Sequence, residues 1–172
     1  HACMNREQIL RRRLKRLTWF FIVSLVISGA TAMPLNWEVG LLVRWFGLAG
    51  QTSATAPTEL GRWLLTAQEA LQAVTATHPL LFYGTDWLAF GHFVIALAFV
   101  GALREPVRNR WLLDFGLIAC AMVIPFALVF GALRGIPFWW RLIDCSFGVF
   151  GAIPVWFGRR YSLELEHHLS GR

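Results

Sequence analysis

The sequence is short of charge, because only 15% of its 172 residues are Asp, Glu, Lys or Arg, against about 25% in ordinary soluble domains. It contains one lysine, Lys15, so that fifteen of the sixteen basic residues are arginines. Its three cysteines, at positions 3, 120 and 145, match no zinc, haem-attachment or redox spacing. These shortages exclude a disordered chain, a coiled coil and a small disulfide scaffold, and they argue against a soluble domain.

What is abundant is apolar sequence, with 56% hydrophobic residues and a mean hydropathy of +0.53. This surplus falls in long uncharged runs of the length that a membrane-spanning helix needs, about 20 residues. Tryptophans stand at the ends of the runs, as in the aromatic belt of membrane proteins. We therefore predict an all-α integral membrane protein, a bundle of four transmembrane helices in a single membrane domain over 1–172. The predicted spans are about 17–37, 85–104, 111–133 and 137–158.

The first run follows a basic stretch in which five of the six residues 11–16 are Arg or Lys. It is too long for the apolar region of a signal peptide and ends without a small-residue cleavage site, so we expect a transmembrane helix. His1 to Cys3 precede Met4 and are typical of a tag remnant, and we leave them out of the functional argument.

Residues 38–84 have a different pattern. The stretch 38–50 is apolar but short, with Glu38 and Arg44 inside it, which is typical of an interfacial segment. Residues 51–57 have the composition of a loop. From 58 to 77 the sequence predicts an amphipathic helix that Pro79 terminates. Its apolar face would consist of Leu60, Trp63, Leu64, Ala67, Leu71 and Val74.

The distribution of arginine predicts the orientation. The N-terminus, the turn 104–110 and the pair 159–160 together hold ten Arg or Lys from Arg11 onward, whereas the other side holds Arg44, Arg62 and Arg134. Both termini are therefore predicted to be cytoplasmic in a bacterial-type inner (plasma) membrane, with the interfacial helix on the outer side. The arginines follow topology, and no stacking platform accompanies them, so the expected partner is the lipid bilayer and not nucleic acid.

Ionisable side chains inside a span mark functional sites by default. His92 and Asp144 are expected at a similar depth, and Asp144 lies about 10 Å along the helix from Pro137. If their helices are neighbours, His92 would meet Asp144, and Asp86 would meet Arg141 in a shallower layer. The predicted ligand-binding residues near the outer leaflet are His92, Asp144, Arg141, Asp86, Tyr83, His78 and Arg134.

A purely structural interpretation of the same residues stays open. Arg141 and Asp144 are three positions apart and could neutralise each other. Asp86 could cap its helix, and His92 could bond a neighbouring carbonyl. The sequence does not decide between these roles and a binding site.

Other polar groups predict less. Asp114 is expected to pair with Arg110 on the surface, and the ELEHH tail, 164–168, to be solvated. No metal motif is present, so no metal site is predicted. A bis-histidine haem needs two intramembrane histidines, and only His92 qualifies. Cofactors and catalytic residues therefore stay unassigned, and no enzyme activity is predicted.

Two function classes remain. The first is a phospholipid- or quinone-binding protein with its polar pocket near the outer leaflet. The second is a non-catalytic scaffold or accessory subunit, whose apolar face at Trp63, Leu64 and Leu71 would contact a partner. Small residues such as Gly131 and Gly135 permit close contact within the bundle, in a homo-oligomer or with a partner membrane subunit. Transport is a weaker hypothesis, because no polar stripe crosses the bilayer.

Overall fold

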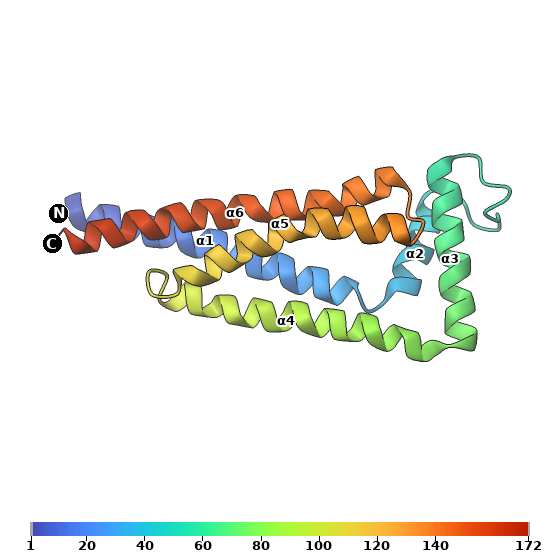
Figure 1. Ribbon diagram of the computed structural model, residues 1–172, viewed down its shortest axis with the longest axis horizontal. Helices are drawn as coiled ribbons and strands as arrows, with labels where there is room; N and C mark the ends of the chain where they lie inside the picture. The colour runs from blue at the N-terminus through green and yellow to red at the C-terminus, as the bar shows by residue number, and fades with distance from the viewer. Residues whose placement is uncertain (1, 172) are drawn as a thin grey trace. The chain divides into compact units, whose positions relative to one another are not determined.

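The computed structural model describes residues 2–171, with side chains from Arg6 onward, so that His1 lies outside the described residues. The chain is 84% helical, and the described residues contain no strand, which confirms the all-α prediction. Figure 1 shows the elements in chain order. They are α1 (Ala2–Thr31), α2 (Leu35–Trp45), α3 (Glu59–Thr77), the 3-10 turn η1 (Pro79–Phe82), α4 (Tyr83–Arg104), α5 (Arg110–Leu133) and α6 (Phe138–Ser170).

Among the described residues, three helical segments are long and apolar enough to cross a membrane. They are Arg6–Thr31 in α1, Pro79–Arg104 in η1 and α4, and Arg110–Leu133, which is α5. Helix α6 is not among them, and it carries Arg141 and Asp144 within its apolar part.

Two helix boundaries differ from those expected. The run 17–37 is divided, because α1 ends at Thr31 and α2 begins at Leu35. Pro34, the N-cap residue of α2, lacks an N–H and disfavours helical geometry at the residue before it. Helix α6 continues through residues 159–170, where a short solvated tail was expected, because Ser162 and Leu165 are fully buried there.

The chain forms two compact units: residues 1–24 with 95–172 make unit 1, and residues 25–94 make unit 2. In unit 1, α6 packs along α5 (Figure 1). Small residues permit this close packing, because a Cβ added at Gly148 would lie 2.5 Å from the carbonyl oxygen of Cys120. Phe99, Leu113 and Val155 are almost completely buried in this unit.

The charged end of unit 1 is connected by three ion pairs between helices. Glu164 of α6 pairs with Arg6 of α1 at 2.6 Å. Glu166 of α6 pairs with Arg110, and Arg159 pairs with Asp114. The expected Asp114–Arg110 pair is therefore wrong, because α6 supplies each residue with a partner from another helix. The Ser162 hydroxyl also donates a 2.8 Å hydrogen bond to the buried carbonyl of Pro106.

In unit 2, α2 and α3 pack around a small core of Val43, Leu48, Leu64 and Leu65. Helix α3 begins at Glu59 because the hydroxyl of Thr58 accepts a 3.0 Å hydrogen bond from the backbone N–H of Gly61. The Glu69 carboxylate then holds the connecting loop by accepting hydrogen bonds from the N–H and hydroxyl of Ser53, at 2.9 and 2.8 Å.

The same unit brings the end of α1 against the beginning of α4. A Cβ added at Gly29 would lie 2.9 Å from the Cβ of His92 and 3.0 Å from the carbonyl oxygen of Ala89. Glycine therefore allows the α1 backbone to contact α4 at the turn that carries His92.

Candidate functional site

The seven residues predicted to bind a ligand are distributed over both units. Unit 2 contains His78, Tyr83, Asp86 and His92, and unit 1 contains Arg134, Arg141 and Asp144. Within each unit, no two of these described residues share a hydrogen bond or an ion pair. Each candidate residue therefore has its own contacts, separate from those of the others.

Arg141 is held against α5. Its guanidinium donates a 3.1 Å hydrogen bond to the carbonyl of Leu128, and its side-chain stem covers Gly131, where an added Cβ would be 2.5 Å from the arginine Cδ. The guanidinium carbon lies 5.2 Å from the centre of the Phe138 ring, within cation–π range. Its Nε–H is buried and has no acceptor among the described residues.

Asp144 lies one turn further along α6 and is half-buried. It makes no hydrogen bond and no ion pair with the described part of unit 1, and in particular none with Arg141. The neighbouring hydroxyl of Ser146 bonds the backbone carbonyl of Ile143 at 2.6 Å. Backbone carbonyls also only accept hydrogen bonds, so the Asp144 carboxylate cannot bond them as the Ser146 hydroxyl does. It requires a hydrogen-bond donor from outside its own helix turn.

His92 has one satisfied ring nitrogen. Its Nδ1 lies 2.8 Å from the carbonyl oxygen of Leu88, one turn earlier in α4. Because a carbonyl only accepts hydrogen bonds, this contact assigns the proton to Nδ1. In the neutral ring, Nε2 is then an acceptor, and within unit 2 no described residue bonds it. The expected bond to a carbonyl and a ligand-binding role are thus compatible, since they use different nitrogens.

The other four candidate residues, Tyr83, His78, Arg134 and Asp86, are exposed. Tyr83 stacks edge-on against Trp87, with ring centroids 5.9 Å apart, and His78 shares a 2.9 Å hydrogen bond with the Thr77 hydroxyl. Arg134 ends α5 with its side chain exposed.

Asp86 has no capping role in the described structure. The 3-10 turn leads directly into α4, so the N–H of Tyr83 already bonds carbonyls of the turn. The hydroxyl of Thr85 donates to the carbonyl of Phe82 at 2.7 Å and accepts no backbone N–H. The carboxylate of Asp86 is therefore available to solvent or to a ligand.

Sequence analysis missed an open cleft of about 400 Å³ in unit 2. Trp37, Gly40 and Arg44 share one face of α2 along it, and Gln68 of α3 contributes an amide. Asn36 also lines it, and its amide donates to the Thr75 hydroxyl at 2.5 Å. The three- and four-residue spacing of Trp37, Gly40 and Arg44 was the available sequence signal for a shared face. The full lining is Asn36, Trp37, Gly40, Val43, Arg44, Ala49, Gly50 and Gln68.

No cluster of three or more His, Cys, Asp or Glu side chains among residues 6–171 has the geometry of a metal site. Comparison of the chain with protein-family models, with curated proteins and with solved structures finds no match. The functional argument therefore depends on the residues described above.

Proposed function

We propose that this chain is a small inner-membrane protein that binds a lipid-like molecule, a phospholipid or a quinone, by its polar head near the outer leaflet. The observation that carries the proposal is the pair Arg141 and Asp144 on α6. The two lie in an apolar segment, and neither neutralises the other. An unpaired charge at such a depth is expensive, so these groups favour a bound polar partner.

The proposal includes a fourth span, from about 137 to 158 in α6, beside the three candidate spans. It also includes cytoplasmic termini, as the arginine distribution predicts, and an outer position for α2 and α3. Leu64 is buried and Trp63, Leu71 and Val74 are half-buried, whereas Glu59, Arg62 and Glu69 are exposed. This burial pattern supports an amphipathic α3 at the interface.

The donor and acceptor set fits a lipid-like head. The Arg141 guanidinium has N–H groups beyond the one that bonds Leu128, and these would donate to a phosphate oxygen or a quinone carbonyl, while Asp144 would accept from an ammonium or hydroxyl group. His92 Nε2 would accept from a hydroxyl group. Exposed apolar residues on the same turns of α6, Leu142, Ile143 and Phe147, would border the tail. That His92 and Asp144 share one ligand remains a prediction from the sequence.

The scaffold hypothesis receives less support from α3. Leu64, one of the residues expected to contact a partner protein, is only 2% exposed and packs against Val43 and Leu48 of its own chain. A partner would therefore need another surface.

The test is native mass spectrometry of the full chain in mild detergent, with an absorbance spectrum and lipid extraction of the same sample. Asp144→Asn removes the charge at constant shape. His92→Asn retains a donor for the Leu88 carbonyl while it removes Nε2. Glu59→Gln is the control, because it removes one exposed carboxylate outside these residues.

We expect a co-purifying lipid or quinone in the wild-type and control proteins, and its loss in Asp144→Asn. If His92 contacts the same ligand, His92→Asn also loses it. Bare protein in all samples would refute the proposal and direct attention to a partner chain. A quinone spectrum, or a phospholipid mass without one, would name the ligand class.

A further inference from the structure

The charged end of unit 1 carries more cations than its own carboxylates can neutralise. Residues 6–16, 104–114 and 159–168 contain eleven Arg or Lys and five Asp or Glu. Each of the five carboxylates forms an ion pair with a different arginine. Six cations remain without an ion pair among the described residues, and all six are exposed: Arg12, Arg13, Lys15, Arg16, Arg104 and Arg160.

A groove of about 550 Å³ runs beside α6 at this end. Its lining is Phe157, Arg160, Tyr161, Leu163, Glu164 and His167. Two of these residues are contacted by α1, since Arg6 pairs with Glu164 and the Arg13 guanidinium lies 5.8 Å from the centre of the Tyr161 ring. The described lining residues all belong to α6, and α1 lies beside the groove through these two contacts. Its one carboxylate, Glu164, is already paired.

The register of the two helices aligns their charged and apolar parts. The contacts Arg6–Glu164 and Arg13–Tyr161 show that α1 and α6 run antiparallel. Arg16, one turn beyond Arg13, then comes level with Phe157. Arg16 is the last cation before the uncharged run of α1, and Arg160 follows Phe157 after one turn of α6. Both helices thus change from apolar to cationic at one level.

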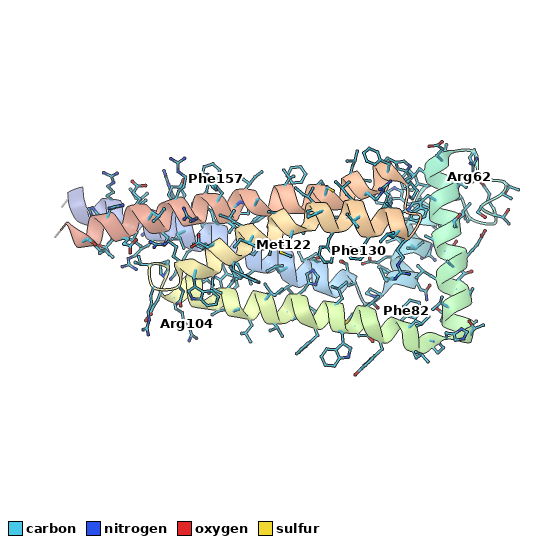
Figure 2. All side chains as sticks on the ribbon, in the orientation of Figure 1. Arg62, Phe82, Arg104, Met122, Phe130 and Phe157 are labelled. Atoms are coloured by element: carbon cyan, nitrogen blue, oxygen red, sulfur yellow. The ribbon has the colours of Figure 1, made fainter. Side chains whose placement is uncertain are left out.

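This combination has the chemistry of a phospholipid headgroup site. Phe157 is 43% exposed, and Figure 2 labels it at the upper edge of α6 in that view. It offers an apolar wall to an acyl chain, next to the cations that attract a phosphate. A nucleic acid or an acidic peptide would gain from the cations and not from the apolar wall.

We propose that this groove of α6, beside α1, binds an anionic phospholipid of the membrane leaflet that is predicted to be cytoplasmic. Arg160 contacts the lipid phosphate, Arg12 and Arg16 supply further positive charge, and Phe157 contacts the first part of an acyl chain. This site goes beyond the proposed function, since Arg160 is sixteen residues, about 24 Å, along α6 from Asp144. Loss of one site would leave the other intact.

The experiment measures the affinity of the full chain in mild detergent for phosphatidylglycerol and for phosphatidylcholine, by native mass spectrometry and by lipid-induced shifts in melting temperature. The test variant is the triple Arg12→Gln, Arg16→Gln and Arg160→Gln. The control is the double variant Arg44→Gln with Arg62→Gln, which removes charge from two exposed arginines that have no ion pair among the described residues and belong to neither proposed lipid site. It is matched in charge by the test double Arg16→Gln with Arg160→Gln.

A cation near an anionic lipid surface contributes about 1 kcal/mol, so we expect the test triple to bind phosphatidylglycerol about 100-fold more weakly. The control double should bind like wild type, and added salt should weaken wild-type binding. If the test triple does not fold, the charge-retaining triple Arg12→Lys, Arg16→Lys and Arg160→Lys is compared with the single variant Arg160→Gln. Lysine should then retain most of the preference, and Arg160→Gln should weaken it.

Equal affinity for the two lipids would overturn the proposal. So would an equal loss in the control double and the test double, or retention of nucleic acid or an acidic protein in place of lipid. The proposed outer-leaflet ligand is measured separately through Asp144→Asn. If that ligand does not bind, the effect of the arginine variants on phosphatidylglycerol affinity can still be interpreted. If the arginine variants have no effect, binding of the outer-leaflet ligand can likewise still be measured.

Discussion

Gly148→Ala should separate α5 from α6, because no side chain fits at this position. The added Cβ would lie 2.5 Å from the carbonyl oxygen of Cys120 and 3.1 Å from the Cβ of Val123, whereas ordinary contacts begin at about 3.4 Å. The obstacle is backbone, which cannot rotate away as a side chain can. Helix α6 must therefore move by about 0.9 Å.

The structure allows an estimate of the cost. A gap of about 0.5–1 Å already loses a quarter to a half of the dispersion energy of each contact, and overpacking in a tight interface costs about 1–3 kcal/mol. We take about 3 kcal/mol, since a backbone atom is in the way. Alanine recovers about 1 kcal/mol of helix propensity over glycine. The net loss is about 2 kcal/mol, or a fall in melting temperature of about 4–8 °C at this chain length.

The measurement is thermal unfolding in detergent, monitored by circular dichroism at a fixed detergent concentration. Gly91→Ala is the control, because Gly91 lies inside α4 and an added Cβ there meets nothing within 4 Å. It should unfold at the wild-type temperature or slightly above it. Equal melting temperatures for Gly148→Ala and Gly91→Ala would refute the argument that α6 requires glycine at its contact with Cys120.

Three other predictions concern separate contacts. In Glu69→Gln the two hydrogen bonds from Ser53, which lower the pKa of Glu69 below its ordinary 4.5, lose their charged acceptor. The stabilisation is complete above that pH and is lost as pH falls through the lowered pKa, so wild-type and variant melting temperatures should differ at neutral pH and converge in acid; a constant difference would contradict this. Gly29→Ala should lower the melting temperature, because the added Cβ pushes α1 away from α4. An unchanged melting temperature would contradict the close contact at Gly29. Ser162→Ala leaves the buried Pro106 carbonyl without its donor and should cost about 1–3 kcal/mol, measured by chemical denaturation; a cost below about 0.5 kcal/mol would mean that another donor replaces the hydroxyl.

Several features were accessible from the sequence because their causes are local. The amphipathic spacing from Leu60 to Val74 and the Pro79 terminator predicted a helix over 58–77, and α3 runs from Glu59 to Thr77. Pro34 could have predicted the division of the first apolar run, since proline disfavours helix at the preceding residue whatever the tertiary contacts.

The partners of the charged residues were not accessible in the same way. Asp114 has Arg110 four residues before it, and the local rule favoured that pair. In the structure α6 passes beside both residues, so Asp114 pairs with Arg159, and Arg110 with Glu166. The same packing buries Ser162 and Leu165, so that residues expected to form a polar tail form the last turns of α6. Arg141 likewise bonds the Leu128 carbonyl of α5, which lies thirteen positions away.

The sequence by itself determined the helical class and the apolar segments, because span length and uncharged composition are properties of each segment alone and require no neighbour. It also supplied the surplus of arginine at the predicted cytoplasmic end. Only the tertiary structure decided which five of those cations are neutralised and which six have no ion pair among the described residues. The physical reason is that an ion pair forms at about 3–4 Å, and the helix register that brings two side chains to this distance is set by packing along the whole interface, including residues such as Gly148, which is distant in sequence from Asp114 and Glu166.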